Sequence, residues 1–434
     1  MRSAVSGASL GDRRIWLIAA YGFACGLPFP LSGFTLRQWM SEGGLSLGAI
    51  GLTANIGLAY SLKFLWAPLL DQVRPPRPLH RLGRRRGWLA AIQPALSLSC
   101  VLLALSRPAA APLAAVAAAA AVAFFSASQD IVVDAWRIEI FPRDLQGAAL
   151  AGYVWGYRLA LMISGGGAIA LAGRLGWHGS LLAMAALTVT GLLVTLIAPE
   201  PLGRVITAAP GAVARARAAV IAPLREFFGR PGALPILAFV VLFHLGEAMA
   251  GVMLPPFYRA LGFDRAAVAI ANGPISPLAT LAGVTAGGWL VARLGLGRAL
   301  ILTGFGKMAA MLMYVGLAYA AGARPMLFAT SMVEAFTEGL VDAAFIAYLS
   351  SLCAVAYTAT QYALLSSLAV IASRTIGGFS GFMAAAVGWI PFYLLCTAAA
   401  LPAMLIMLWL LRRYPPARSG VGPRAQPAAS GEPA

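Results

Sequence analysis

Residues 112–137 read PLAAVAAAAAVAFFSASQDIVVDAWR, and this stretch decides the fold class. Its uncharged first part is long enough to cross the apolar core of a bilayer as an α-helix. A chain inside lipid must satisfy its own backbone hydrogen bonds, so the stretch has to be helical. Asp130 and Asp134, four residues apart, then lie on one face of that helix. The stretch predicts a membrane span that carries two carboxylates.

The composition of the whole chain agrees with that stretch. Of 434 residues, 60% are hydrophobic and 11% are charged, and the mean hydropathy is +0.81. Soluble domains carry about 25% charged residues, so this composition excludes a soluble globular protein. The four cysteines (Cys25, Cys100, Cys353 and Cys396) lie in apolar stretches without CxxC spacing, which favours small core residues over a disulfide framework or metal site.

Apolar stretches of spanning length recur along the chain and predict an all-α polytopic membrane protein with about twelve spans. The predicted spans are 15–36, 47–70, 87–107, 112–137, 145–172, 179–199, 235–257, 266–290, 298–320, 325–350, 357–383 and 389–411. We divide the chain into two six-helix bundles, 15–199 and 235–411. Residues 1–14, the loop 200–234 and the disordered tail 412–434 complete it, all predicted to be cytoplasmic.

The basic residues predict the orientation. With both termini in the cytoplasm, 22 Lys and Arg fall in inner segments, 6 in outer segments and 4 within spans. The net charge of +17 could also suggest nucleic acid, but the basic residues occupy short loops, as topology signals do. Arg13 and Arg14 precede a long apolar run without a cleavage site, which favours a permanent first span over a signal peptide.

Two loops at matching positions of the predicted halves suggest an internal repeat. The first combines Asp71 with the basic residues Arg84, Arg85 and Arg86. The second, GGWLVARLGLGR at 287–298, contains Arg293 and Arg298 but has Ala292 where an acid would be expected. Both resemble the major-facilitator loop motif, and we predict that they act as conformational gates.

Ionisable residues inside spans are costly and therefore indicate function. The acids within the predicted spans are Asp130, Asp134, Glu247, Glu334, Glu338 and Asp342. The last three recur every four residues, so they form a stripe along one helix. A carboxylic acid removed from water holds its proton more tightly, and neighbouring acids strengthen this effect. We therefore predict that these acids couple transport to protons, although internal bracing by basic residues is the alternative.

Four bases lie within the predicted spans. Arg158 and Arg374 occupy equivalent positions in the two halves and are candidate partners of the acids or anchors for substrate. Lys63 is a further candidate, whereas Lys307 is expected to snorkel or to brace its helix. His244 and Glu247 share a helix face, which is more typical of a polar pair than of a metal site.

Several segments resemble the AmpG-like muropeptide permeases of the major facilitator superfamily. They are KFLWAPLLD at 63–71, GRRRGWL at 83–89, SASQDIVVDAW at 126–136, GYR at 156–158, SGG at 164–166 and ATQYALLSS at 359–367. The resemblance implies a major-facilitator fold. It also implies proton-driven import across the bacterial inner membrane of GlcNAc-1,6-anhydro-MurNAc, with or without peptide. Such import feeds peptidoglycan recycling and can set the signal for β-lactamase induction.

A sugar cargo of this kind needs neutral hydrogen-bonding groups and a cation for its carboxylate. Gln129, Gln361 and Asn55 are predicted to supply the former, and Arg158, then Lys63, the latter. Larger members of the family have two extra hydrophobic segments, so related branches that carry siderophores or acetyl-CoA remain alternatives. A receptor or scaffold without transport is a third possibility.

No nucleophile elbow, Cys–His pairing or phosphate loop points to an enzyme. We expect no cofactor and no metal. The expected partners are the small-molecule cargo, protons and the lipid bilayer, without nucleic acid, and the protein is expected to be a monomer.

Overall fold

The computed structural model describes residues 12–142, 145–201, 228–229, 232–320, 322–352, 370–371 and 373–413. Every regular element in these ranges is helical. Asp12 starts the first helix by accepting a hydrogen bond from the backbone N–H of Arg14 at 2.9 Å. Asp12 lies before the predicted first span, and the hydrogen bond from the Arg14 side chain lowers the pKa of its carboxyl group.

The helical segments between residues 13 and 197, which we call the N-terminal half, are short at first and long later. They are α1 (Arg13–Gly26), α2 (Pro28–Leu31), α3 (Phe34–Glu42), α4 (Leu47–Leu52), η1 (Thr53–Gly57), α5 (Leu58–Leu62), η2 (Lys63–Leu65), α6 (Ala67–Gln72), η3 (Leu79–Leu82), α7 (Arg84–Leu105), α8 (Pro112–Ile140), α9 (Gln146–Met162), η5 (Ile163–Gly167) and α10 (Ala168–Ile197).

The segments between residues 233 and 413 form the C-terminal half. They are α12 (Ala233–Phe243), α13 (Leu245–Val252), α14 (Leu254–Ala260), α15 (Arg265–Ile270), η6 (Ala271–Ile275), α16 (Ser276–Leu294), α17 (Leu296–Tyr319), α18 (Arg324–Leu352), α20 (Ser380–Val387), α21 (Trp389–Ala398) and α22 (Leu401–Arg413). Residues 373–377 are also helical.

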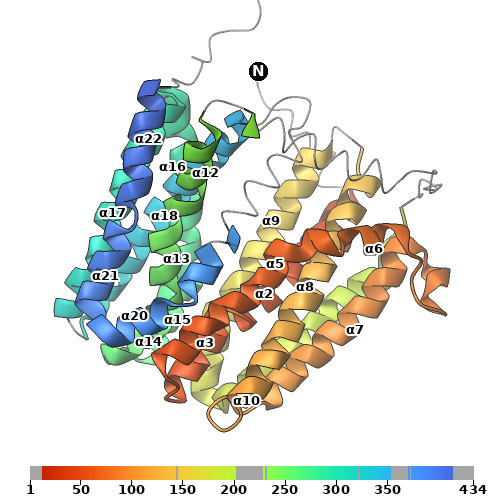
Figure 1. Ribbon diagram of the computed structural model, residues 1–434. Coiled ribbons are helices and arrows are strands. Elements are labelled where there is room, and N and C mark those ends of the chain that lie inside the picture. The colour runs from red at the N-terminus through yellow and green to blue at the C-terminus, as the bar shows by residue number, and fades with distance from the viewer. Residues whose placement is uncertain are drawn as a thin grey trace, which may run out of the picture.

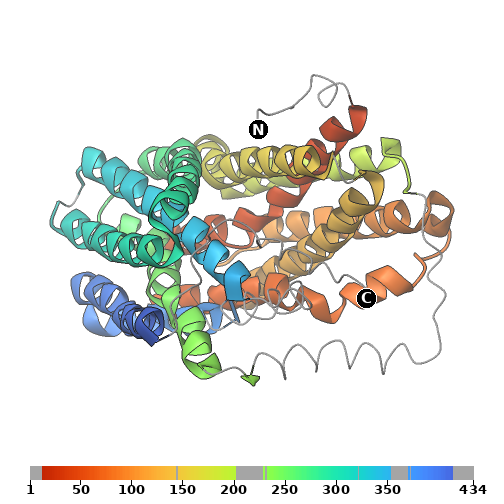
Figure 2. The ribbon, with the colours of Figure 1, turned by 90° about the horizontal axis from the view of Figure 1, so that it is seen from above.

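The two halves lie side by side (Figures 1 and 2). The most extensive helix packings are within a half: α1 with α9 and α7 with α10 in the first, α16 with α18 and α17 with α18 in the second. Between the halves, α4 packs on α20, α3 on α14 and α10 on α15. The last two contacts lie at the end of the molecule where α3, α14 and α15 converge in Figure 1.

The predicted spans are helical along the described residues. Within the described ranges, eight helical stretches are long and apolar enough to cross a membrane, and one of them, Ala149–Ile197, is 49 residues long. Gly176, with φ of 70°, interrupts that stretch between the predicted spans 145–172 and 179–199. The shorter Leu47–Leu62 and the acid-bearing α18 correspond to the predicted spans 47–70 and 325–350. Residues 353–369 lie outside the described residues, and they include residues 357–369 of the predicted span 357–383.

The boundary predicted for the first span was wrong. The helical stretch runs from Arg13 to Glu42 rather than ending at residue 36. It bends where Pro28 begins α2 and again at Gly33, whose backbone is not helical. Because the helix continues, Arg37 lies inside the protein and not in an outer loop, where the charge count had placed it.

The halves join through glycines. The π-helices η5 and η6 meet where a Cβ atom on Gly166 would lie 2.4 Å from the Cα of Gly273. At the other junction, a Cβ on Gly381 would lie 1.8 Å from the carbonyl oxygen of Leu47. Both distances are far below van der Waals contact, so only glycine permits these backbones to approach so closely.

A polar lock closes the end where α3, α10 and α15 meet. Glu42 accepts hydrogen bonds from Arg265 of the other half, at 2.8 Å from Nε and 2.6 Å from Nη2. The Nε1 of Trp177 donates to the same carboxylate at 2.7 Å, and Gln38 donates to its second oxygen at 3.0 Å. The two Arg265 nitrogens and Trp177 all donate to one oxygen, Oε2, and hydrogen bonds to an ionised carboxylate are stronger than those between neutral groups. We call Glu42, Arg265 and Trp177 the interhalf lock.

Glu42→Gln should shift the protein toward a conformation in which this end is open. Loss of a charge-assisted hydrogen bond costs about 1.5–3 kcal/mol, which is roughly a tenfold to hundredfold change in an equilibrium. Spin labels at Leu175 and Ala260, one on each half, would report it as added long distances in electron–electron double resonance.

Asp264→Asn is the matched control. Its surface pair with Arg324 stays within one half, and asparagine also caps helices well. Coincident distance distributions for Glu42→Gln and wild type would show that the lock does not hold the halves together.

Candidate functional site

A cavity of about 660 Å³ lies between the halves, within the range of pockets that hold small organic ligands. Its charged lining has both signs. The acids are Glu247, Glu334, Glu338 and Asp342, and the basic side chains are Arg37, His244 and Arg374. The stripe predicted on 325–350 therefore faces a cavity together with Glu247 and Arg374.

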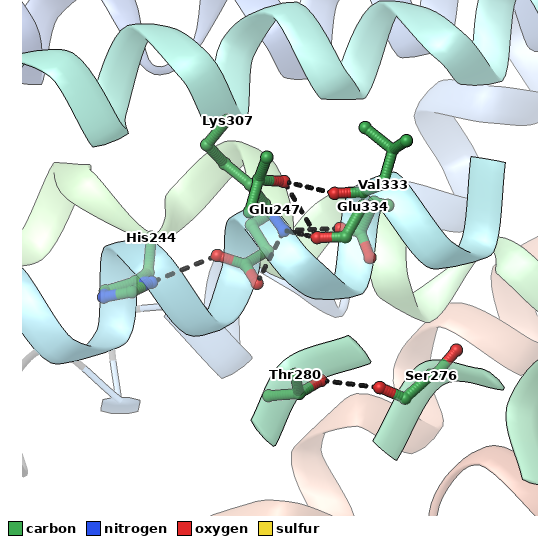
Figure 3. Close-up of polar contacts among 8 residues, drawn as sticks. His244, Glu247, Ser276, Thr280, Lys307, Val333 and Glu334 are labelled. Carbon is green, nitrogen blue, oxygen red and sulfur yellow. Dashed lines mark hydrogen bonds and ion pairs between the residues drawn. The ribbon is translucent and has the colours of Figure 1, made fainter. Parts of the chain in front are cut away.

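Lys307 connects three helices at the edge of this cavity. Its Nζ lies 2.5 Å from Oε1 of Glu334 on α18 and 3.3 Å from Oε1 of Glu247 on α13. It also donates to the main-chain carbonyl of Glu334 at 3.4 Å. An ammonium has three N–H donors, so these contacts use all of its capacity. Figure 3 shows the side chain of Lys307 reaching between the two carboxylates.

The expectation that Lys307 snorkels is wrong, and the bracing alternative describes its contacts. Lys307 stands at the middle of the 24-residue α17, about 16 Å from either end at 1.5 Å per residue. That distance exceeds the reach of a lysine side chain, so its charge must be balanced locally. The side chain is only 7% exposed, and a central position in a span was the signal that indicated an internal partner.

Three carboxylates crowd around this one ammonium. Oxygen atoms of Glu247, Glu334 and Glu338 all lie within 4.8 Å of one another. His244 adds a hydrogen bond to Oε2 of Glu247 at 3.2 Å from Nδ1. Carboxylates at such distances cannot all be ionised at low cost, so the cluster favours retention of a proton. We call Glu247, Glu334, Glu338, Lys307 and His244 the acid–lysine cluster.

The predicted acids of the N-terminal half have different surroundings. Oδ1 of Asp130 is buried and accepts no hydrogen bond from the described part of the chain. Asp134 is 43% exposed and lies 3.5 Å from Arg137, one turn further along α8. Thus Asp130, unlike Asp134, has a buried carboxylate oxygen without a hydrogen-bond partner among the described residues.

The neutral residues predicted to bind sugar are placed differently. Gln129 is 1% exposed and donates to the main-chain carbonyl of Ala24 at 3.0 Å. It therefore joins α8 to α1, and it is not among the residues that line the main cavity. Asn55 donates to the carbonyl of Leu52 at 3.2 Å. Gln361 lies outside the described residues.

Among Arg158, Lys63 and Arg374, the cations predicted to bind substrate, Arg374 is placed at the main cavity. It lines the main cavity and a second one of about 310 Å³. Arg37, which the sequence analysis missed, lines both cavities as well. Lys63 lies in η2 and Arg158 on α9, both half-buried, and neither lines these two cavities.

The predicted gate arginines of the first loop are bound within their own half. Glu139, at the end of α8, pairs with Arg84 at 3.0 Å and with Arg85 at 2.6 Å. Glu200 accepts the backbone N–H groups of Arg85 and Arg86 at 2.8 and 2.9 Å, so its carboxylate caps the first turn of α7. Sequence reasoning missed both glutamates because they lie at span ends.

The remaining residues of the predicted gate loops lie in varied surroundings. Arg293 lies over the ring of Trp289 at 5.4 Å, and Arg298 is exposed. Asp71 lies in α6, and its side chain is outside the description. The gating role of both loops stays a prediction.

A family model of the Major Facilitator Superfamily matches residues 17–323 and 241–433. The chain belongs to this superfamily. The two overlapping matches together cover almost all of the chain. This agrees with the major-facilitator fold and the transport class predicted from the sequence.

Within the superfamily, the chain belongs to the AmpG-like permeases. It is 39% identical over 394 residues to the anhydromuropeptide permease of Escherichia coli, covering 90% of this chain and 78% of that protein. It is 31% identical over 412 residues to an AmpG-type transporter of Rickettsia felis, covering 93% and 97%. The family resemblance predicted from the sequence is confirmed.

Solved structures share the fold. A D-xylose-proton symporter superposes with a TM-score of 0.69 at 12% identity, covering 91% of this chain and 96% of that one. A peptide transporter of the POT type gives 0.68 at 15% identity, covering 92% and 94%.

Removal of the central cation should destabilise the acid–lysine cluster in a pH-dependent way. Lys307→Gln leaves Glu247 and Glu334 without their partner, and breaking a buried pair costs about 3–5 kcal/mol. The folded variant will then bind more protons than the unfolded chain, so its stability falls as pH rises. We expect its Tm to lie below that of wild type at pH 8 and to approach wild type at pH 5, as measured by tryptophan fluorescence in detergent.

Arg107→Gln, which removes an exposed cation from the loop between α7 and α8, should leave Tm unchanged at both pH values. A Lys307→Gln protein as stable as wild type at pH 8 would contradict the pairing.

Proposed function

We propose that this chain is a proton-coupled importer of anhydromuropeptides in the bacterial inner membrane. The cargo is GlcNAc-1,6-anhydro-MurNAc, with or without peptide, taken up for peptidoglycan recycling by alternating access. The cargo assignment rests on the 39% identity to the anhydromuropeptide permease over 90% of the chain. The cavity of about 660 Å³ between the halves supports it, because a disaccharide is within the size of ligand that such pockets hold.

Proton coupling is supported by the acids at and near the cavity. In the acid–lysine cluster, three carboxylates share one ammonium, so uptake or release of a proton changes the charge of the cavity wall. Asp130 supplies a second buried carboxyl in the other half. A group that binds a proton in one conformation and loses it in the other links the proton gradient to the concentration gradient of the cargo.

The predicted orientation indicates which end of the protein faces the periplasm. With both termini in the cytoplasm, Arg13 is at the inner side, and Glu42, at the other end of the first span, is at the periplasmic side. The interhalf lock then closes the periplasmic end, and this conformation corresponds to the inward-facing half of the transport cycle. Import requires the lock to open before cargo can enter.

Transport, rather than catalysis or a scaffold role, accounts for the cost of these groups. A membrane scaffold gains nothing from burying Glu247, Glu334 and Glu338 around a cavity, since each ionisable group in a span is costly. The related transporters support the same assignment. The signal for β-lactamase induction would follow from the imported cargo rather than from a further site on this chain.

Uptake into proteoliposomes tests both parts of this proposal. Labelled anhydro-disaccharide should accumulate when the outside is acidic and not when the gradient is absent. Asp130→Asn and Glu338→Gln should lose gradient-driven accumulation at least tenfold. They should retain exchange of labelled for unlabelled cargo, because exchange needs cargo binding and alternation but no net proton movement.

Asp264→Asn, an exposed acid outside the cavity, controls for the loss of a carboxylate. If folded and inserted wild-type protein takes up no disaccharide, the cargo assignment is wrong and a siderophore becomes the leading alternative. Gradient-driven accumulation by Asp130→Asn and Glu338→Gln at the wild-type level would contradict proton coupling at these residues.

A further inference from the structure

Arg37 and Arg374 come from opposite halves and line the same two cavities. Arg37 lies on α3, and Arg374 lies in the helical segment 373–377. Two like charges therefore border the same enclosed space. Such an arrangement is unfavourable unless something negative lies between or beside them.

Neither arginine has a carboxylate within ion-pair distance in the described part of the chain. The undescribed residues 353–369, which precede Arg374, contain no Asp or Glu in the sequence. Of the acids that line the main cavity, Glu247 and Glu334 are engaged with Lys307 and His244. The two guanidinium groups therefore have no direct ion pair with an acid among the described residues.

Their hydrogen-bonding groups are also unused. Nε of Arg37 and Nε of Arg374 are each buried without a partner among the described residues, as is Oγ of Ser373 beside the main cavity. Buried polar atoms are normally satisfied, and each exception calls for an explanation such as a bound ligand. Two guanidinium forks and one hydroxyl offer donors that match the oxygens of a carboxylate.

The backbone of the N-terminal half makes room for one of these groups. A Cβ atom on Gly57 would lie 2.0 Å from Nη1 of Arg374 and 2.4 Å from its Cζ. The guanidinium therefore rests directly on the glycine backbone at the end of η1, and any larger residue there would displace it. Gly57 belongs to the N-terminal half and Arg374 to the C-terminal half, so the position of Arg374 depends on contact between the halves. Gly57 also lines the second cavity.

We propose that Arg37 and Arg374 together bind a carboxylate of the cargo, and that Gly57 holds Arg374 in place for it. This inference rests on the proposed function, because it names the lactyl or peptide carboxylate of the muropeptide as the ligand. It replaces Arg158 and Lys63 as the predicted carboxylate anchor. Because the pair spans the two halves, cargo bound there contacts both of them at once.

The test compares the anhydro-disaccharide, whose lactyl carboxylate is free, with its uncharged methyl ester. Binding to the purified full-length protein is measured by isothermal titration calorimetry at pH 7.5. Arg37→Gln and Arg374→Gln should each weaken binding of the acid roughly tenfold to a hundredfold, the cost of a charged hydrogen bond, and leave ester binding within twofold. Arg374→Lys, which keeps the charge but not the fork, should fall between wild type and Arg374→Gln.

Gly57→Ala tests the support without removing any charge. It should weaken binding of the acid as Arg374→Gln does, while Gly306→Ala, whose Cβ would meet nothing within 4 Å, should match wild type. Arg107→Gln controls for the loss of a positive charge elsewhere.

The outcomes separate the two proposals. Wild-type protein that binds acid and ester equally, with no discrimination by the arginine variants, would overturn the carboxylate site and leave the cargo assignment standing. An equal loss of both ligands in Arg37→Gln and Arg374→Gln would assign the arginines to structure instead. Wild-type protein that binds neither ligand would overturn both proposals.

Discussion

The structure depends on the rule that a charge buried in a membrane protein must find its partner inside the protein. Lys307 meets that rule through two carboxylates on two other helices, so α13, α17 and α18 are fixed against one another by a polar contact. Apolar side chains cannot provide such specificity in lipid, where the surrounding tails are as apolar as the side chains themselves. The same cluster holds more carboxylates than cations, and this surplus gives it a chemical as well as a structural role.

Small residues set the second constraint. Where the halves meet, Gly166 approaches Gly273 and Gly381 approaches Leu47 more closely than any side chain would allow. The polar groups are then displaced toward the cavity and toward the end that contains Glu42. At Gly57 close backbone packing and charge meet, because the guanidinium of Arg374 rests on that glycine.

Much of the fold could be predicted from hydropathy, because each span must be long, apolar and helical for reasons that act locally. The acidic stripe at 334, 338 and 342 could also be predicted, since helical spacing alone aligns it. The pairings could not. Glu42 and Arg265 are 223 residues apart, and no local pattern indicates that they meet. Arg37 was misplaced because a helix bent at Pro28 and Gly33 uses more residues per span than a straight one. The hydrogen bond of Gln129 to the carbonyl of Ala24 could not be predicted, because spacing does not reveal which neighbour a polar face meets.

The contact between η5 and η6 has a consequence for the speed of transport. Two helices that touch through bare backbone have no interlocked side chains there, so they can roll over each other with little repacking. Reorientation of the halves then meets its main resistance at the distant polar contact of Glu42 with Arg265 and Trp177. The part of the resistance that comes from this contact is electrostatic, so it should weaken as the ionic strength at that end of the protein rises.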